Sequence, residues 1–250
     1  MEEKTGVVLA NGPLVRPVTM DEFQRMFGYI YGEANKDIPI ERLISILGQV
    51  ACLGVMKNAR KNGRLGLIEQ LPNLMSRSLA IQNRLGFNAE ADHHFKFPGV
   101  CSYCLRADGC VCSFKKTSEE GSTPEGMARL AALRADKANL PKSLRDHQLL
   151  HEKLYGRRHE EYSLLHISTR LVEEVAEVSE ANDLGHMDEL QLELVDIQSW
   201  VFGICNLINV DRPKHERIYI DDLIWDFYPY QCKRCHRNVC CGECGKRVGA

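Results

Sequence analysis

Two consecutive segments in the second half of the chain repeat apolar residues at every third or fourth position. They span 167–181 and 190–208. An α-helix returns to the same face with this period, so the pattern predicts two amphipathic helices that each bury one side in a core. The longest apolar run, at 195–210, contains polar side chains and is too short to cross a bilayer. We therefore expect a buried helix there and no membrane span.

Each of these segments carries two carboxylates one helical turn apart, in or beside its apolar stripe. They are Glu174 with Glu177, and Glu193 with Asp196. Ionised carboxylates are costly in apolar surroundings, and four that converge also repel one another. A hard divalent cation relieves both effects, and Mg²⁺ commonly shares its oxygen ligands with phosphate groups. The pattern predicts a Mg²⁺ site for phosphate chemistry, with a solvated acidic face as the alternative.

The same residues carry a resemblance to a known family. The string Glu173-Glu174-Val175-Ala176-Glu177, followed by Glu193-Leu194-Val195-Asp196, resembles the E-E-x-x-E and E-x-x-D signature of the MazG-type all-α nucleoside triphosphate pyrophosphohydrolases. The resemblance covers 145–210. It implies Mg²⁺-dependent cleavage of a nucleoside triphosphate to monophosphate and pyrophosphate, with Glu174, Glu177, Glu193 and Asp196 as catalytic metal ligands. Glu173 matches the signature but falls on another helix face, which makes it the weaker ligand candidate.

Several polar residues around the signature could contact such a substrate. We name Lys153, Arg157, Arg170 and Asn206 as candidate substrate-binding residues, with Arg158 also available for phosphate contacts. The cations have an ordinary alternative as surface charges of a helix. Asn206 could equally be a buried, hydrogen-bonded asparagine or a polar surface residue.

The chain also contains an internal repeat, which is informative for fold assignment. Three stretches recur in the same order: 27–32 with 150–156, 83–88 with 206–211, and the aromatic and cysteine-rich 97–104 with 228–235. We therefore expect an all-α protein made of two tandem MazG-like helical modules that pack as an intramolecular pseudo-dimer. Members of the resembled family usually assemble as homodimers or larger, so a homo-oligomer is also possible.

The two copies differ at the carboxylate positions. Alignment places Gln49, Cys52, Gln70 and Asn73 opposite the four acids of the second copy. The first copy is therefore predicted to be a degenerate module without a catalytic metal. Its basic residues at 57–64 could form a solvated face or a clamp for the triphosphate. The predicted modules are 1–114 and 143–250, joined by a linker at 115–142 with a helix at 127–138.

Most of the eleven cysteines lie in two short clusters that each open with C-x-x-C. This spacing suits tetrahedral Zn²⁺, so each module is predicted to end in a small zinc-binding knuckle. We assign the first site to Cys101, Cys104, Cys110 and Cys112. We assign the second site to Cys232, Cys235, Cys241 and Cys244, which leaves Cys240 spare and His236 as a less favoured substitute.

The odd number of cysteines and the lack of an apolar leader at the N-terminus favour zinc over disulfides. An iron–sulfur cluster would use the same thiolates and remains open. Four thiolates leave no open position on zinc, so we expect both zinc sites to be structural and far from the carboxylates. Cys52 and Cys205 lie in apolar helical patterns and are expected to be core residues.

Composition agrees with a cytoplasmic protein that acts on a small molecule. The net charge is −2 and apolar residues make up 44% of the chain, so no nucleic-acid partner is expected. Two other functions remain open. One is a nucleotide sensor that does not hydrolyse its ligand. The other is a nucleic-acid or protein adaptor whose knuckles bind through a basic patch of Lys233, Arg234, Arg237, Lys246 and Arg247.

Overall fold

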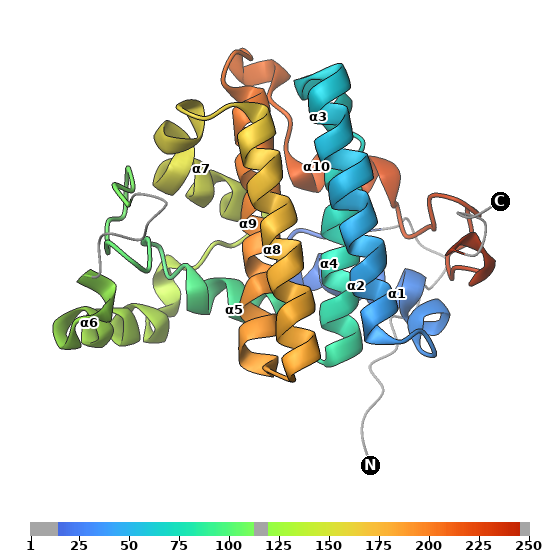
Figure 1. Cartoon of the computed structure of the whole chain (residues 1–250), viewed down its shortest axis with the longest axis horizontal. Helices are drawn as coiled ribbons and strands as arrows, with labels where there is room; N and C mark the ends of the chain where they lie inside the picture. Colours follow the sequence, from blue (N-terminus) through green and yellow to red (C-terminus); the bar gives the residue numbers. More distant parts are fainter. Residues whose placement is uncertain (1–14, 113–119, 246–250) are drawn as a thin grey trace.

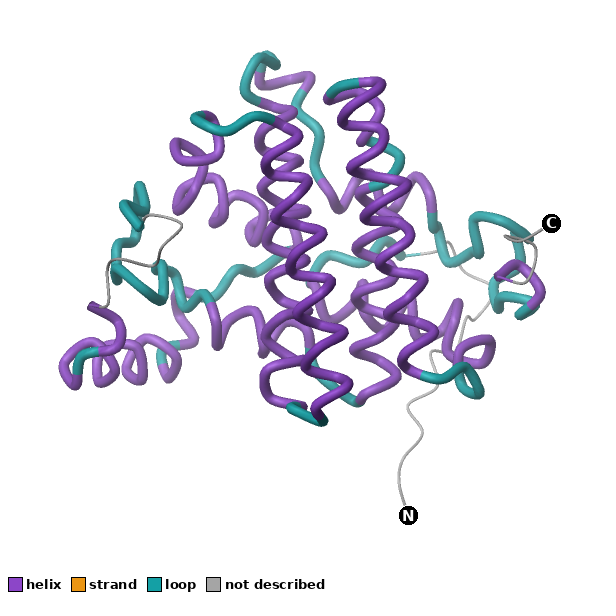
Figure 2. The backbone as a smooth tube through the Cα atoms, in the orientation of Figure 1, coloured by secondary structure: helices purple, strands orange, loops and turns teal. Residues whose placement is uncertain are grey.

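The computed structural model describes residues 15–112 and 120–245, and this part of the chain is built from helices without a β-strand (Figure 2). The predicted all-α class is confirmed. The helices of the first half are α1 (Met20–Asn35), α2 (Ile40–Gln49), α3 (Lys57–Asn62), α4 (Leu71–Leu85) and α5 (Ala89–Lys96), with a π-helical stretch at Val50–Met56 between α2 and α3. The remaining helices are α6 (Pro124–Ala135), α7 (Leu144–Glu160), α8 (Leu164–Leu184), α9 (Met187–Asn209) and α10 (Ile220–Phe227).

Local sequence signals set where these helices begin and end. Thr19 and Glu22 form a capping box at the start of α1, and the Ser163 hydroxyl accepts a hydrogen bond from the first turn of α8. Gly185 ends α8 with a φ of 71°, a left-handed conformation that glycine adopts without strain. The short turn that follows sends α9 back along α8.

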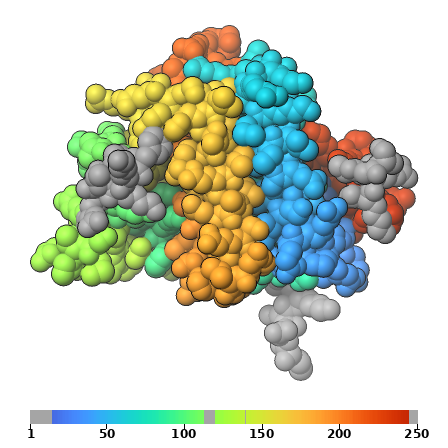
Figure 3. All heavy atoms as spheres, in the orientation of Figure 1, coloured from blue at the N-terminus to red at the C-terminus, as the bar shows by residue number. Residues whose placement is uncertain are grey.

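The long helices form a two-layered core. α8 lies beside α2 and α3 on one face of the molecule, as Figures 1 and 3 show. α9 packs against α8 and α4 packs against α9, so both contribute to the layer behind. The apolar stripes predicted for α8 and α9 are buried, including Leu171, Val178, Leu194 and Val201. The polar side chain of Gln198 is also buried there, and it donates to Gln82 and Ser78 on α4.

A set of buried hydrogen bonds occurs once in each half. In both halves an asparagine amide donates to the backbone carbonyl of a glutamine, and the side-chain carbonyl of that glutamine accepts from the first backbone N–H of a short helix. The first set is Asn83 to Gln24 at 2.8 Å and Ala89 N to Gln24 at 2.9 Å; the second is Asn206 to Gln148 at 3.0 Å and Ile220 N to Gln148 at 2.9 Å. Asn83 and Asn206 are aligned by the repeated stretches, and Gln24 and Gln148 lie shortly before another aligned pair of stretches, 27–32 and 150–156.

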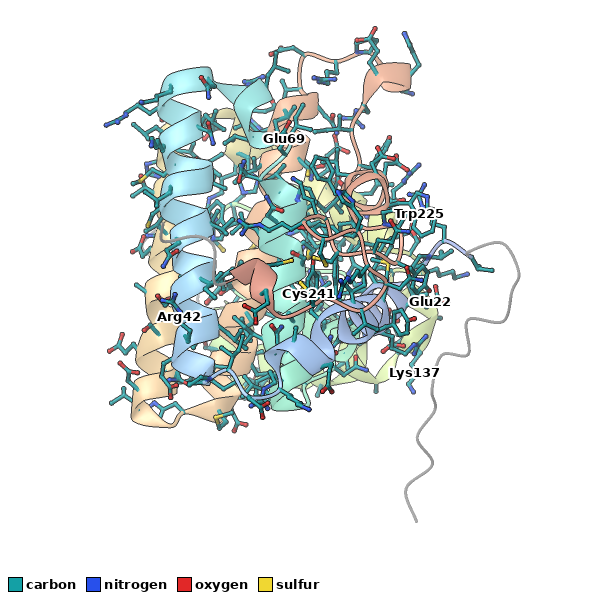
Figure 4. All side chains as sticks on the ribbon, turned by 90° about the vertical axis from the view of Figure 1, so that its right-hand side faces the viewer. Glu22, Arg42, Glu69, Lys137, Trp225 and Cys241 are labelled. Carbon is teal, nitrogen blue, oxygen red and sulfur yellow. The ribbon has the colours of Figure 1, made fainter. Side chains whose placement is uncertain are left out.

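The two cysteine clusters sit at opposite ends of the molecule, each against the first helix of the other half (Figure 1). The backbone N–H of Cys110 donates to Leu154 O on α7 at 2.7 Å, and that of Cys240 donates to Ile30 O on α1 at 2.8 Å. Figure 4 views the side that carries the second cluster, where Cys241 is labelled. The halves are thus joined by crossed contacts as well as by the shared core.

The segment between the halves contains α6, which overlaps the helix expected at 127–138. Leu130 of α6 packs with Val100 and Leu105, which flank the cysteines of the first cluster. The segment between the halves therefore contacts this cluster. No single helix within 15–112 and 120–245 is long and apolar enough to span a membrane. By length and composition, α1 together with Ile40–Asn62 passes only as a pair bent by 116°.

Candidate functional site

Three of the four predicted carboxylates converge between α8 and α9. Glu174, Glu177 and Glu193 each offer an oxygen, and these oxygens lie within 4.8 Å of one another. The tight turn at Gly185 makes α8 and α9 antiparallel neighbours, so two pairs at helical spacing face each other. Asp196 lines the same pocket, where it forms an ion pair with Lys96 of α5.

Burial and mutual repulsion make the charged form of this group unfavourable. Glu174 is 7% exposed and accepts a hydrogen bond from Trp200 Nε1 at 3.0 Å. Burial, and then the charge of Asp196, raise the pKa of Glu174 to about 8. Burial is also the main cause that raises the pKa of Glu193 to about 7, although Lys96 opposes it. Such shifts are typical of carboxylates gathered around a cation site.

The donor set fits a hard divalent cation. Glu193 Oε2 is buried and receives no hydrogen bond from a donor within the described part of the chain. A buried carboxylate oxygen without a partner is costly, and a metal ion would supply one. Carboxylate oxygens are the ligands that Mg²⁺ prefers.

The carboxylates open into a cavity of about 190 Å³. Water occupies about 30 Å³ per molecule in the liquid, so the cavity has room for a hydrated ion together with part of a phosphate chain. Its walls combine the acids with cations, hydroxyl groups and aromatic rings. The non-acidic lining residues are Lys96, Phe97, Cys101, Ser102, Tyr103, Cys112, Tyr155, Arg158, His159, Arg170, Ser199 and Trp200.

Of the residues named for substrate or phosphate contacts, Arg158 and Arg170 line the pocket, and the other three do not. Lys153 lines a separate shallow depression with Pro141 and Leu149. Arg157 is exposed and does not line the pocket, because the helix turns the neighbouring Arg158 into it instead. Asn206 is buried, does not line the pocket and is hydrogen-bonded to Gln148, as in the structural alternative given for it.

Sequence reasoning missed Lys96 and His159. Lys96 is contributed by the first half and had no local signal, because only the fold brings it to Asp196. His159 packs into a gap left by Gly203, where a Cβ would lie 2.5 Å from its Cε1, and its ring centroid is 5.4 Å from that of Trp200. Burial lowers the pKa of His159 to about 4, which keeps its imidazole neutral near pH 7. Nδ1 of this ring is buried without a hydrogen-bond partner among the described residues.

The equivalent positions in the first half are occupied by neutral side chains. Asn73 Oδ1 accepts a hydrogen bond from Tyr228 Oη at 2.6 Å. Gln70 lies against Gly54, where a Cβ would be only 2.7 Å from its Oε1. The backbone at Val50–Met56, which contains the aligned Cys52, is π-helical rather than α-helical. The polar side chains of Asn73 and Gln70 therefore contact neighbouring residues of the chain.

The first cysteine cluster has the predicted membership. One sulfur from each of Cys101, Cys104, Cys110 and Cys112 lies within 4.8 Å of the others, so the group can hold a metal ion. Tyr155 of α7 packs against this cluster. Burial, with Tyr228 and Cys232 nearby, raises the pKa of Tyr31 on α1 beside the second cluster.

The second cluster corrects one predicted ligand. The four sulfurs that lie within 4.8 Å of one another belong to Cys232, Cys235, Cys240 and Cys244, and Cys241 is not in the group. The hydrogen bond from Cys240 N to Ile30 O holds this cysteine against α1. The hydrogen bond from Cys110 N to Leu154 O holds Cys110 against α7 in the same way. Cys241 remains adjacent, with its sulfur 3.5 Å from that of Cys244.

The expectation that both clusters lie far from the carboxylates is also wrong. Cys101 and Cys112 line the same cavity as the acids, because the first cluster docks on α7 beside the pocket. The second cluster does not line this cavity.

The basic patch of the second cluster is partly engaged within the chain. Lys233 Nζ lies 3.9 Å from the centre of the Phe227 ring, and Arg234 donates to the carbonyl of Cys244 at 2.6 Å. Lys246 and Arg247 lie outside the described residues.

Comparison with known proteins adds no family assignment. Protein-family models, curated proteins and solved structures contain no match to this chain. Any conclusion about function must therefore come from the carboxylates, the cations and the cysteine clusters themselves.

Proposed function

We propose that the chain is a Mg²⁺-dependent nucleoside triphosphate pyrophosphohydrolase whose catalytic site lies in the second half. The observation that carries this proposal is the convergence of Glu174, Glu177 and Glu193 within 4.8 Å, in a cavity that also holds Asp196 and the guanidinium of Arg170. A carboxylate cluster beside cations is suited to a metal-bound polyphosphate, since each sign of charge then has a partner.

The first half then acts as a degenerate MazG-like partner module, and the chain is an intramolecular pseudo-dimer. The recurrence of the Asn83–Gln24 bond in Asn206–Gln148 supports this arrangement. So does the crossed docking of the two cysteine clusters on α7 and α1. The lysine at the end of α5 reaches the acids from the first half, so the partner module also completes the site.

The roles of the side chains follow from their placement. Glu174, Glu177 and Glu193 would hold Mg²⁺ together with Asp196. Bound Mg²⁺ supplies neutralisation of the phosphate charge. Arg158 and Arg170 offer donors to phosphate oxygens. Glu193 Oε2, which is buried without a hydrogen-bond partner among the described residues, is the oxygen that would face the ion.

Each cysteine cluster would hold one structural zinc ion. Four thiolates close the tetrahedron and leave no position for a reacting water. Binding of zinc to such a site contributes on the order of 10 kcal/mol of apparent folding free energy. This free energy would stabilise the two cysteine loops, which have few apolar residues of their own.

A screen of common and modified nucleoside triphosphates with Mg²⁺ tests the proposal, with both pyrophosphate and orthophosphate measured. We expect pyrophosphate release by the wild type and none by Glu177→Gln, whereas Glu180→Gln on an exposed face of α8 should behave as the wild type. Tight binding without pyrophosphate release would indicate a sensor. Salt-dependent oligonucleotide binding without turnover would indicate an adaptor.

A further inference from the structure

The two cysteine clusters dock in the same way but meet different surroundings. We define knuckle 1 as 97–112 and knuckle 2 as 228–244. In the described structure knuckle 1 forms a wall of the carboxylate cavity, to which it contributes Phe97, Cys101, Ser102, Tyr103 and Cys112, and knuckle 2 does not line that cavity. The difference calls for a role of knuckle 1 beyond folding.

Knuckle 1 is held rigidly at the cavity from two sides. On the inner side, Gly109 N and Cys110 N donate to the carbonyls of Lys153 and Leu154 on α7, at 3.1 and 2.7 Å. Arg158, which lines the cavity, also places its Nη1 4.0 Å from the Cys110 sulfur. The knuckle and the catalytic half thus share one wall.

On the outer side the segment between the halves clamps the Ser102–Tyr103 turn. Gly121 N donates to Tyr103 O at 2.8 Å, and a Cβ on Gly121 would lie 1.9 Å from Ser102 O. Only glycine permits this approach of the two backbones. The backbone of the turn is therefore fixed while its side chains border the cavity.

The chemistry of this wall differs from that of the carboxylate end. Knuckle 1 brings a hydroxyl and aromatic rings to the cavity but no cation. Four thiolates and one divalent zinc ion would sum to roughly −2, which disfavours phosphate oxygens nearby. Arg158 lines the same cavity 4.0 Å from the Cys110 sulfur and offsets part of this charge, while Lys96 and Arg170 line the cavity with the acids. We expect the charged end of a triphosphate at the three glutamates that would hold Mg²⁺, and its nucleoside at knuckle 1.

We infer that knuckle 1 is the nucleoside-binding wall of the site, with the Tyr103 ring and the Ser102 hydroxyl contacting the nucleoside part of the substrate. This inference rests on the proposed function and deepens it. An aromatic ring is suited to stack on a base, because every base presents a π-face. The Ser102–Tyr103 turn belongs to the first half, which lacks the carboxylate cluster. The degenerate module would therefore recognise the nucleoside, while the second module performs the hydrolysis.

The repeat provides matched controls for a test. Lys233 and Arg234 occupy the positions of Ser102 and Tyr103 between the paired cysteines of knuckle 2. Binding to the full-length, zinc-loaded protein would be measured by calorimetry with Mg²⁺. The probes are α,β-imido analogues of the four common deoxynucleoside triphosphates, and inorganic tripolyphosphate, which has no nucleoside.

We expect Tyr103→Ala to weaken binding of the best-bound analogue about 5- to 150-fold, as expected for the loss of one base stacked on an aromatic ring. Tyr103→Phe keeps the ring and should restore the affinity, and Lys233→Ala and Arg234→Ala should leave it unchanged. Tripolyphosphate should bind all variants alike. Zinc content is measured in each variant. If Tyr103→Ala loses zinc, the affinity of Ser102→Ala for the analogues is compared with that of the wild type instead.

Two results would overturn the inference. One is an unchanged affinity of Tyr103→Ala and Ser102→Ala for every analogue. The other is an equal loss for analogue and tripolyphosphate, which would mean a general disturbance of the site. If the wild type releases pyrophosphate while either result is found, the inference fails and the proposed function stands. If the wild type binds neither probe and releases no pyrophosphate, both fail.

Discussion

Lys96, the last residue of α5, forms an ion pair with Asp196 on α9, and its ammonium group also donates to the Leu192 carbonyl at 3.0 Å. The two side chains are only 14% and 23% exposed. This contact explains why Asp196 stands apart from the other three carboxylates: its charge already has a partner. It also links the carboxylate site of the second half to a helix of the first.

Replacement of Lys96 by methionine should destabilise the metal-free protein. The change leaves Asp196 partly buried without its counter-charge, next to three other acids, and we expect a loss of about 1–3 kcal/mol in unfolding free energy. Added Mg²⁺ should recover most of it, because the ion replaces the missing positive charge. Urea unfolding with and without Mg²⁺ measures both effects. Lys36→Met, at an exposed pair with Glu33, serves as the control, and an equal loss there would contradict the assignment.

Neutralisation of the carboxylates should separate activity from stability. Glu174→Gln should lower kcat by about 100-fold or more, because it removes a ligand of the charge-stabilising ion. The same change relieves repulsion, so the metal-free protein should be as stable as the wild type or more stable. Asp196→Asn should also abolish turnover but should reduce stability, since it breaks the pair with Lys96. Near-normal activity in both variants would rule out the metal site.

The raised pKa values of Glu174 and Glu193, to about 8 and about 7, predict how stability depends on pH. Between about pH 5 and 7 these groups hold protons in the folded metal-free protein but are ionised in the unfolded chain. At these two groups the unfolded state then binds fewer protons, so their contribution to stability falls as pH rises, by up to about 1.4 kcal/mol per pH unit for each proton. The buried histidines His93, His147, His151 and His159 have lowered pKa values and contribute with the opposite sign below about pH 7, so the carboxylate contribution is the difference between the wild type and Glu174→Gln. Urea titrations from pH 5 to 8 measure the slope.

Glu174→Gln should remove the falling contribution of this carboxylate, and saturating Mg²⁺ should do the same by holding the carboxylates ionised. Mg²⁺ affinity should rise with pH over the same interval, because binding displaces protons. An identical pH dependence of stability in metal-free wild type and metal-free Glu174→Gln would contradict this account of the site.

The cysteine clusters predict two zinc ions per chain. Cys101→Ser and Cys240→Ser should each remove one equivalent of zinc and lower the melting temperature, since each site then lacks a thiolate. Cys241→Ser should retain both ions, although the sulfur of Cys241 lies 3.5 Å from that of Cys244. Elemental analysis of anaerobically purified variants decides this. Iron with inorganic sulfide, or zinc loss from Cys241→Ser alone, would contradict the assignment.

The helices and the carboxylate pairs could be predicted because both are local properties of the sequence. The spacing of Glu174 and Glu177 places them on one helix face whatever the rest of the chain does. The repeated stretches likewise indicated which residues occupy equivalent positions, including Asn83 and Asn206. For Asn206 the sequence left a substrate contact and a buried hydrogen bond open, because a polar residue on a buried face and one in a pocket have the same local pattern.

The remaining features depend on tertiary contacts and carry no local signal. Cys240 and Cys241 are chemically identical neighbours, and the choice between them is made by the hydrogen bond to Ile30 on a distant helix. Likewise, nothing local predicts that the His93 ring lies between those of His147 and His151, with nitrogen separations of 3.0 and 2.9 Å in the core. The arrival of Lys96 and knuckle 1 at the carboxylates is of the same kind.

The central claim is that the carboxylates of the second half, and not the aligned residues of the first, support cleavage between the α- and β-phosphates. Phosphorus NMR of a nucleoside triphosphate incubated with Mg²⁺ tests it most directly, with the wild type, Glu193→Gln and Gln70→Ala compared. We predict monophosphate and pyrophosphate in equal amounts from the wild type and from Gln70→Ala, and no products from Glu193→Gln. Release of orthophosphate with a diphosphate, or undiminished turnover by Glu193→Gln, would contradict the account.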